Sequence, residues 1–594
     1  MKVKPGVAFP DFISSEKQKK RGDLYEKYLR TREFFIPLFL IIMVLGIVVK
    51  LFSLQVLKGS YYQDLSDTNR IKTITIYAPR GIILDSKGNP LTYNVPGFRE
   101  NVAGKTRVLE KDEALSLIAG GEKDLEIDSL RSYPYKDVFS HVLGYIGQIS
   151  EDELKNPKYE SYKAGDLIGK MGIEEAYQSI LRGIDGKELI EVNNLGETVR
   201  RLGQTDPIPG EDIVVTLDLR LQKVAFEAMK EVKKGAAIVS TPKGEILVLL
   251  SKPSFDPNLF TLGKSYKPFS SSSYRSVEEV LSDTVNQSLL NRAISGVYPP
   301  GSTFKLVVAA SGLENKIINQ NFEIVDTGVI NVGAFSFSNW YFTQYGKTDG
   351  EVNIVKGIKR SNDVFFYKLG EKIGVDKISE MAEHFGLGKK LGIDLSGEEE
   401  GLIPSPSWKK SYIGEPWYLG DTYNYSIGQG YILTTPLQVN YWTQVFSNGG
   451  DFYRPHLIKG SFAPSKKNLI GTEALNLIRE GMRQSCSPGG VAWPLFEFRV
   501  QNSKLRIDGK NFLEVPEATT SANFEDYRKV SVACKTGTAQ HGGEGTLPHA
   551  WITLFAPAYD PEIVVTVLVE ESGEGSNIAA PIAKKILEAY FQGK

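Results

Sequence analysis

The 594-residue chain contains only two cysteines and five histidines, and its formal net charge is −1. Two cysteines, Cys486 and Cys534, cannot build the disulfide framework of a small secreted domain, and a chain of this length does not need one. The near-zero net charge excludes the strongly basic composition that is typical of nucleic-acid-binding proteins. Whether the two cysteines pair with each other stays open at this level, because pairing depends on their separation in space.

The histidines form no recognisable metal-binding motif. No two of them are four residues apart, and the chain contains no Cys-x-x-Cys sequence. The histidines are His141, His384, His456, His541 and His549. The glycine-rich segment at residues 386–390 lacks the spacing of a phosphate-binding P-loop. The sequence therefore predicts neither a metal centre nor a bound cofactor.

A long hydrophobic run lies near the N-terminus. It covers residues 34–49, resumes after Lys50 and ends near Leu57, which is about the length of a membrane-spanning helix. A buried core helix is disfavoured because the run is apolar on every face, and a cleaved signal peptide is disfavoured by the length of the run. Residues 1–33 hold nine Lys/Arg and five Asp/Glu. The positive-inside rule therefore predicts a cytoplasmic tail at 1–33, a single-pass signal anchor at 34–57 and an extracytoplasmic remainder.

Three short motifs indicate serine acyl-transfer chemistry: Ser302-x-x-Lys305, Ser361-Asn-Asp363 and Lys535-Thr-Gly537, in this order along the chain. A lysine one helical turn from a serine can act as its base without any histidine, provided that burial and nearby positive charge lower the lysine pKa. A second hydroxyl can relay protons, and a strand bearing Lys-Thr-Gly offers backbone N–H groups and a cation to the substrate.

Sequence context distinguishes Ser302 from the other serines that precede a lysine by three residues. Ser14, Ser240 and Ser407 lie in basic or proline-containing segments that are typical of solvated loops. Ser302, in contrast, follows a Pro-Pro-Gly sequence and opens an apolar pattern over residues 302–313 that predicts a helix. Ser302 is thus expected at a helix N-terminus, with Lys305 on the same face.

Residues 291–305, NRAISGVYPPGSTFK, resemble the catalytic helix of class B penicillin-binding proteins. The resemblance extends in order along most of the chain. Residues 236–258 resemble the opening hairpin of the transpeptidase domain in that family, residues 426–438 a later segment, and residues 69–91 the start of the membrane-proximal pedestal.

This resemblance implies an α/β (α+β) serine D,D-transpeptidase domain of the β-lactamase-like fold, on an elongated α+β pedestal with one N-terminal transmembrane helix. We assign the pedestal, of the penicillin-binding protein dimerisation type, to residues 58–211 and the transpeptidase domain to residues 212–594. The expected catalytic residues are Ser302, Lys305, Ser361, Asp363 and Lys535. The expected oxyanion-hole and substrate-binding residues are Ser302, Thr536, Gly537 and Thr538.

The implied reaction is the cross-linking of peptidoglycan through an acyl-enzyme on Ser302, which β-lactams would trap. The implied partners are stem peptides (a D-Ala-D-Ala donor and an amine acceptor), β-lactams, the membrane and a polytopic glycosyltransferase of the SEDS family; no cofactor and no nucleic acid are expected. A β-lactamase or β-lactam sensor would share the three motifs but gives no reason for a pedestal. A non-catalytic scaffold that activates a glycosyltransferase is disfavoured by the complete motifs.

Details of the motifs favour the cell-elongation subgroup, with the division subgroup as the alternative. Asp363 replaces the more common Asn of the second motif, and residues 549–551 (HAW) resemble the elongation type. Some elongation-type relatives hold a zinc ion between the first two motifs. This chain offers Asp326 and Asp349 there but neither His nor Cys, so no zinc site is expected. The long segment at 488–527 fits neither subgroup; we interpret it as an insertion, with a lid or an interaction arm as the alternatives.

Overall fold

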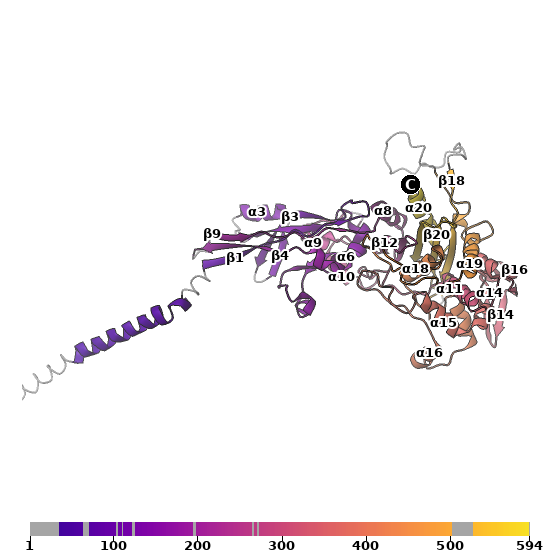
Figure 1. Cartoon of the computed structure of the whole chain (residues 1–594), viewed down its shortest axis with the longest axis horizontal. Helices are drawn as coiled ribbons and strands as arrows, with labels where there is room; N and C mark the ends of the chain where they lie inside the picture. The colour runs from indigo at the N-terminus through magenta and orange to yellow at the C-terminus, as the bar shows by residue number, and fades with distance from the viewer. Residues whose placement is uncertain are drawn as a thin grey trace, which may run out of the picture. The chain divides into compact units, whose positions relative to one another are not determined.

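The computed structural model describes residues 35–62, 70–102, 105–109, 111–120, 125–193, 198–263, 266–269, 272–501, 527–543 and 545–592. The chain divides into two compact units, Met1–Ile76 with Gly186–Asp206 and Tyr77–Asp185 with Pro207–Lys594 (Figure 1). The predicted tail at 1–33 and most of the predicted insertion at 488–527 lie outside the described residues.

The first unit contains the predicted membrane helix and a small sheet. The helix covers Phe35–Leu57. Its most apolar stretch has a mean hydropathy of 2.8, and none of that stretch is buried in the protein. The length and composition of the helix therefore suffice to cross a bilayer. The sheet has the strand order β1-β8-β9 (Ile71–Ile76, Gly186–Val192 and Thr198–Thr205), and both pairs are antiparallel.

The second unit begins with the remainder of the pedestal. A sheet of order β4-β3-β5 (Lys105–Leu109, Tyr93–Val102 and Leu125–Ser132) lies near the hairpin of β6 (Ile146–Gln148) and β7 (Leu167–Gly169) and the short helix α6 (Gly172–Ala176). Glu174 of α6 is fully buried between Arg131 and Arg80, at 2.6 and 2.5 Å. Burial alone would raise the pKa of Glu174, but the two guanidinium groups outweigh it and hold the pKa below its usual value.

Direct hydrogen bonds join this pedestal part to the rest of the second unit. The backbone N–H and C=O of Tyr133 both bond to the side-chain amide of Asn258, at 2.8 Å each. The Tyr177 hydroxyl donates to Asp394 Oδ2 at 2.5 Å. β2 (Ile83–Leu84) also pairs in parallel with β10 (Ile213–Val214). The two parts of this unit therefore share backbone as well as side-chain contacts.

A five-stranded antiparallel sheet of order β12-β11-β21-β20-β19 forms the centre of the transpeptidase part. The strands are β11 (Gly235–Ser240), β12 (Ile246–Lys252), β19 (Ala533–Ala539), β20 (His549–Ala556) and β21 (Ile563–Val569). Successive residues alternate between two cores, as strand geometry requires. Ala237 and Val239 pack with α8 (Leu219–Ala228) and α20 (Ala579–Gln592), whereas Ala236 and Ile238 face the larger core with α11 (Lys305–Glu314) and α18 (Pro436–Ser447).

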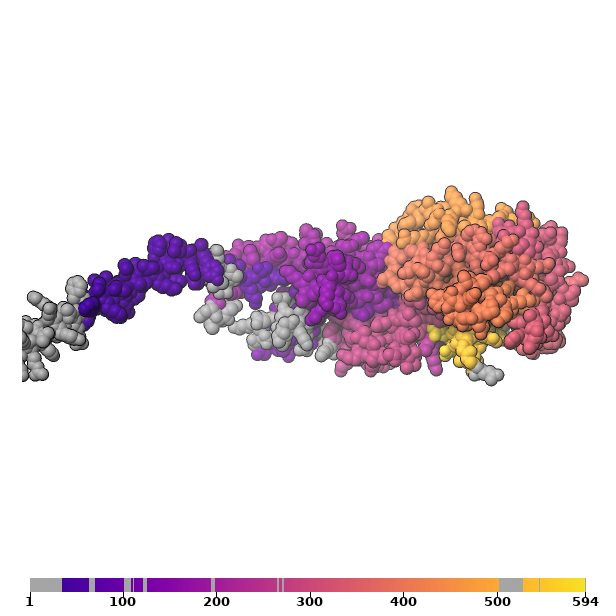
Figure 2. All heavy atoms as spheres, turned by 90° about the horizontal axis from the view of Figure 1, so that it is seen from below, coloured from indigo at the N-terminus to yellow at the C-terminus, as the bar shows by residue number. Residues whose placement is uncertain are grey.

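The helical layer of this part is built around α11. Every residue of α11 from Lys305 to Leu313 is buried, which is expected of a helix that is hydrophobic on all sides. Helices α13 (Ile354–Arg360), α14 (Asp363–Ile373), α15 (Val375–His384) and α19 (Thr472–Ser485) pack around it. In the space-filling view, the segments coloured pink to yellow form one closely packed body (Figure 2). The consequence for the site is that Lys305 lies in a dry interior.

Candidate active site

Ser302 lies in a short 3-10 turn, η4 (Gly301–Thr303), that leads directly into α11. The predicted helix over 302–313 thus begins three residues later as a regular α-helix, while Ser302 stands just before its N-terminus. Gly301 has a φ of +52°, and a Cβ there would come within 3.0 Å of the carbonyl oxygen of Thr538. Glycine therefore allows the nucleophile turn to approach β19 closely.

Lys305 brings a fully buried amine to the centre of the site. Its Nζ donates to Asp363 Oδ1 at 2.6 Å, to the carbonyl oxygen of Ser361 at 2.8 Å and to Ser361 Oγ at 3.3 Å. Burial lowers the pKa of Lys305, and the neighbouring Asp363 carboxylate opposes this shift. The first and second motifs are therefore in direct contact.

Ser361 occupies an unusual backbone position between two helices. It ends α13 with φ 54° and ψ 39°, in the left-handed region that a residue with a Cβ seldom adopts. Its Oγ accepts from Lys535 Nζ at 2.8 Å as well as from Lys305 Nζ. The hydroxyl thus links the two lysines, which fits the proton relay that the motifs predict.

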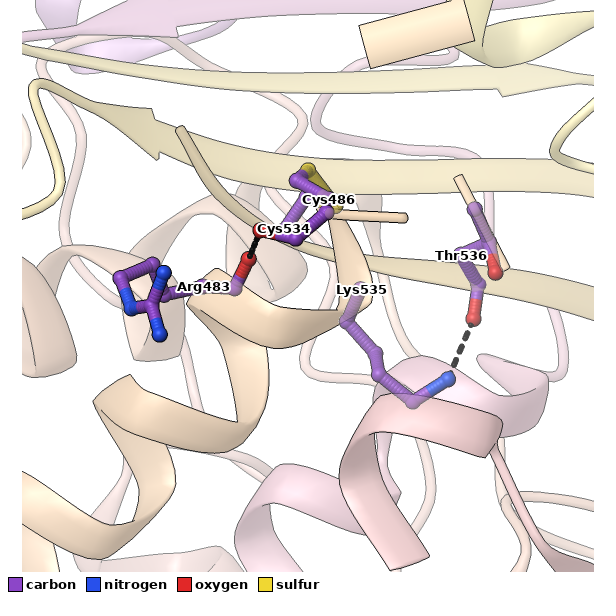
Figure 3. Close-up of a disulfide and its surroundings, with 6 residues drawn as sticks. Arg483, Cys486, Cys534, Lys535 and Thr536 are labelled. Carbon is purple, nitrogen blue, oxygen red and sulfur yellow. Dashed lines mark hydrogen bonds between the residues drawn. A yellow bond between two sulfur atoms is a disulfide. The ribbon is translucent and has the colours of Figure 1, made fainter. Parts of the chain in front are cut away.

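Lys535 reaches the same hydroxyl from the sheet side. It is fully buried in β19, and its Nζ also donates to the carbonyl oxygen of Thr536 at 2.9 Å (Figure 3). Burial lowers the pKa of Lys535 well below its usual value, and the charge of Lys305 lowers it further. Two amines and one carboxylate therefore share a site in which burial favours the neutral form of both amines.

The outer edge of β19 is suited to an extended peptide. Among the described strands β19 is outermost in the sheet, so its backbone can pair with an incoming strand. A Cβ on Gly537 would lie 3.1 Å from the carbonyl oxygen of Pro300, which shows how closely this strand approaches the nucleophile turn. Thr538 is exposed, and its carbonyl oxygen accepts from Gln429 Nε2 at 3.3 Å.

A disulfide resolves the question that the two cysteines left open. Cys486, the C-terminal cap of α19, is bonded to Cys534 of β19, with a Cα–Cα distance of 5.8 Å across 48 residues of chain. Figure 3 shows the disulfide on one side of β19 and the Lys535 side chain leaving the other side. The cross-link therefore tethers the strand without touching the lysine.

Residues 235–588, more than half of the chain, match the family described as "Penicillin binding protein transpeptidase domain", and residues 123–215 match the "Penicillin-binding Protein dimerisation domain". The chain belongs to the penicillin-binding protein family. The resemblance read from the motifs is thereby confirmed.

Individual relatives agree with this membership. The chain is 32% identical to the peptidoglycan D,D-transpeptidase MrdA of Acinetobacter baumannii, over 95% of this chain and 88% of the relative. The structure is similar to that of the penicillin-binding protein PBP2 of Helicobacter pylori in its complex with MreC, with a TM-score of 0.71, 28% identity, and coverage of 88% of this chain and 99% of that one. It is also similar to a chain from a peptidoglycan synthase complex that coordinates polymerization and crosslinking, with a TM-score of 0.68, 28% identity, and coverage of 95% and 99%.

Two residues of this penicillin-binding protein that sequence reasoning missed contact the second motif. The backbone N–H of Trp340 donates to Asp363 Oδ2 at 3.0 Å, and Asn339 Oδ1 accepts from the backbone N–H of Asp363 at 3.2 Å. No sequence signal marks either residue, because Asn339 caps and Trp340 begins the short helix α12 (Trp340–Tyr345), more than twenty residues before the motif. Trp551, in the segment 549–551 that favours the elongation subgroup, donates from Nε1 to the carbonyl oxygen of Pro299. It thereby supports the turn that bears Ser302.

The residues present do not fit the zinc site of some elongation-type relatives. Asp326 and Asp349 lie close together, but N–H donors occupy their oxygens. Within the part of the chain that the structure describes, no group of three His, Cys, Asp or Glu side chains is arranged to hold a metal ion. We therefore assign no catalytic step to a metal.

Proposed function

We propose that this chain is a peptidoglycan D,D-transpeptidase of the cell-elongation type that cross-links stem peptides through an acyl-enzyme on Ser302. The observation that carries the proposal is the Ser361 hydroxyl held between two buried lysine amines, at 2.8 and 3.3 Å, beside the turn that bears Ser302. The similarity to MrdA over nearly the whole chain supports the elongation type.

The proposed catalytic steps follow from the charges around the two lysines. The Asp363 carboxylate favours the charged form of Lys305, whereas burial and the charge of Lys305 disfavour a charged Lys535. The proton therefore stays on Lys305 until the terminal carboxylate of the donor peptide lies beside Lys535 and favours the charged form there. Its transfer through Ser361 Oγ to Lys535 then frees Lys305 to act as the general base. Lys305 then accepts the Ser302 proton while Ser302 Oγ bonds to the carbonyl carbon between the two D-alanines.

The second half of the reaction reverses these proton movements. The terminal D-alanine leaves with a proton as its peptide bond breaks, and the acyl group remains as an ester on Ser302. An acceptor amine from a neighbouring stem peptide then attacks this ester, a new amide bond forms, and Ser302 Oγ regains its proton. A β-lactam enters at the first step, and its opened ring stays on Ser302.

Substrate binding is assigned to β19 and the start of α11. We propose that the backbone N–H groups of Ser302 and Thr538 stabilise the oxyanion, because the glycine at 301 lets the turn and the strand approach closely. Thr536, Gly537 and Thr538 would contact the donor peptide along the strand edge. Protonated Lys535 adds a positive field for the terminal carboxylate of the donor peptide.

The proposed domain arrangement keeps the boundaries drawn from the sequence. Residues 1–33 form a cytoplasmic tail, 34–57 the single-pass anchor, 58–211 the pedestal and 212–594 the extracytoplasmic transpeptidase domain. The basic tail supports the orientation, and the family matches at 123–215 and 235–588 are compatible with the domains.

The proposed macromolecular partner is a polytopic glycosyltransferase of the SEDS family. The likeness to a chain from a peptidoglycan synthase complex supports a polymerising partner, since cross-linking needs newly made glycan strands. A pedestal segment that carries none of the three motifs suits such a contact.

Labelling of the full-length protein with a fluorescent penicillin tests the proposed function. We expect one labelled peptide, which contains Ser302, and no covalent labelling of Ser302→Ala. Lys305→Ala should label about two to four orders of magnitude more slowly, because the serine loses its base. Labelling of Ser302→Ala at another serine would contradict the proposal, and rapid release of the bound penicillin would indicate a β-lactamase instead.

A further inference from the structure

A group of buried polar side chains lies directly behind the Ser361-Asn362-Asp363 turn, with Asp326 at its centre. Asp326 ends β13 (Glu323–Asp326) and is 3% exposed. Its Oδ2 accepts from Asn339 Nδ2 at 2.8 Å, from Asn362 Nδ2 at 2.8 Å and from the backbone N–H of Asp349 at 2.9 Å. A carboxylate that accepts several N–H bonds in a dry interior is held rigidly, because each lost bond would leave a buried polar group unpaired.

Asn339 and Asn362, which are bonded to Asp326, also bond to the backbone within and directly after the second motif. Asn362 follows Ser361 directly, and its Oδ1 accepts from the backbone N–H of Phe365 at 2.8 Å, which caps the start of α14. Asn339 Oδ1 accepts from the backbone N–H of Asp363 at 3.2 Å. Asp326 therefore fixes the two residues that come immediately after Ser361.

The fixed position of Asn362 and Asp363 restrains Ser361, the residue before them, which has an unfavourable backbone conformation. Ser361 has a φ of 54°, which a serine keeps only where its surroundings determine it. The same conformation directs Ser361 Oγ to both lysines. Relaxation of the turn would withdraw the hydroxyl from the pair of amines that it links.

The carboxylates of Asp326 and Asp349 are bonded to donors of the protein itself, one of which is charged. Asn362 Nδ2 lies 2.8 Å from Asp326 Oδ2 and 3.0 Å from Asp349 Oδ2, so an N–H donor stands where a shared cation would bind. Arg360 Nε donates to Asp349 Oδ1 at 2.9 Å and supplies a positive charge. An amide bridge and a guanidinium group thus take the place of a metal ion.

We propose that Asp326 is a positioning residue for the Ser361 relay and that it acts without a metal ion. The inference rests on the proposed transpeptidase function, since it assigns a role in the same acylation step. Asp326 does not reach the reacting atoms; it holds Asn362 and Asp363 so that Ser361 Oγ stays between Lys305 and Lys535.

The test is the acylation of full-length Asp326→Asn by a fluorescent penicillin, followed over time and across pH. An asparagine keeps the size of the side chain but replaces one acceptor oxygen by a donor that faces other donors. We expect acylation about 10- to 100-fold slower, since a displacement of about 1 Å at a reacting group can cost that much. The acid limb of the pH–rate profile should move to lower pH, because both ammonium groups lose an acceptor when Ser361 moves away. A purely structural role would leave this limb in place.

Asp256→Asn is the matched control. Asp256 is fully buried and, like Asp326, accepts from an asparagine side chain and a backbone N–H, both of Asn258, at 2.8 and 3.0 Å. Its chain neighbour Phe255 belongs, with Leu259, to a hydrophobic cluster that is separate from the core around α11. We expect a comparable loss of thermal stability but an unchanged acylation rate and pH profile.

Further measurements make each outcome decisive. If Asp326→Asn does not fold, Asn339→Ala should show the same changes to a smaller extent, because it removes the Asn339 bonds to Asp326 and Asp363 but leaves the bond between Asp326 and Asn362. Wild-type rates and an unmoved acid limb in the folded variants would overturn the positioning role. Loss of acylation after dialysis against a chelator, with recovery on addition of zinc, would overturn the metal-free assignment. If the wild-type protein is not labelled at all, the proposed function fails instead.

Discussion

Lys305 and Lys535 share one hydroxyl acceptor but differ in their electrostatic surroundings. Both are fully buried, and burial lowers the pKa of each. Only Lys305 has a carboxylate partner, Asp363, at 2.6 Å. The proton therefore favours Lys305 before the substrate binds, and the Ser361 hydroxyl provides a direct path to Lys535. The aspartate of the second motif thus adjusts which amine is neutral.

The first residue-scale prediction concerns this aspartate. Asp363→Asn removes the charge that favours protonated Lys305, so the pKa of Lys305 should fall further. Because a larger fraction of Lys305 is then neutral at a given pH, the acid limb of the acylation rate should move to lower pH. Stopped-flow acylation by a penicillin between about pH 5 and 9 measures the shift.

Asp421→Asn serves as the control for this prediction. Asp421 pairs at 2.7 Å with Lys409, another buried lysine, outside the active site. This substitution should leave the acid limb in place. If the acid limb of the acylation rate of Asp363→Asn moved to higher pH, the Asp363 carboxylate would not favour the charged form of Lys305.

At the scale of elements, β19 combines three roles. Its outer edge offers backbone groups to a peptide, one of its faces carries Lys535, and its other face carries the disulfide to α19. The alternation of side chains along a strand allows neighbouring residues, Cys534 and Lys535, to serve separate functions. Sheet, disulfide and relay thus meet in a single strand.

Removal of the disulfide should reduce stability more than activity. For a closed loop of 48 residues, chain entropy accounts for about 4 kcal/mol of the free energy of unfolding. We expect Cys486→Ala/Cys534→Ala to unfold at a lower temperature. Its acylation rate should remain within about tenfold of wild type, because Lys535 keeps its bonds to Ser361 and to the Thr536 carbonyl oxygen.

The comparison of stability and rate separates two roles of the disulfide. A variant that remains folded at the assay temperature yet has lost acylation would show that the cross-link positions Lys535. The unreduced wild-type protein should also expose no free thiol on denaturation, since both cysteines are paired.

At the scale of the whole molecule, the apolar helix bears on where the protein resides, and the buried histidines bear on how its stability depends on pH. The exposed apolar helix Phe35–Leu57 requires a membrane, because its surface is unsuited to water. His141 and His549, in different parts of the second unit, are both buried and have pKa values lowered by burial to about 4. Both histidines must therefore remain neutral in the folded protein.

The topology prediction follows from the basic tail. Protease added outside intact spheroplasts should digest everything after about Leu57 and leave only a short membrane-bound fragment with residues 1–33. A soluble, processed chain that begins near Tyr61 would contradict the signal-anchor assignment.

The pH prediction follows from the two histidines. Their folded pKa of about 4 lies below the usual value of 6.5, so the unfolded chain binds more protons between these values. Stability should be full above about pH 6.5 and should fall as the pH drops toward 4. For the fully buried His141 this shift corresponds to about 3 kcal/mol at most.

Unfolding temperatures between pH 4 and 7 measure this effect. His141→Gln should be less stable at pH 7 but should lose less stability on acidification than the wild type does. Two curves that stay parallel would show that His141 does not contribute to acid sensitivity.

The sequence by itself determined the anchor, the order of the three motifs, the fold class and the family. These features depend on short spacings: a hydrophobic run, a lysine one turn after a serine, and a strand motif after a cysteine. Short spacings translate directly into local geometry, because helix and strand periods are constant. The start of α11 at Lys305, and not at Ser302, is a difference of one helical turn at a boundary that local patterns define poorly.

Only the tertiary structure decided how distant residues combine. The Cys486–Cys534 bond, the hydroxyl shared by Lys305 and Lys535, and the Asp326 group join positions between 13 and 230 residues apart. Such contacts are set by the packing of α11 and α13 against α19, by the packing of α19 against β19 and by the close approach that Gly301 permits. Local sequence carries no record of them, because burial and electrostatic environment arise only when the elements pack together.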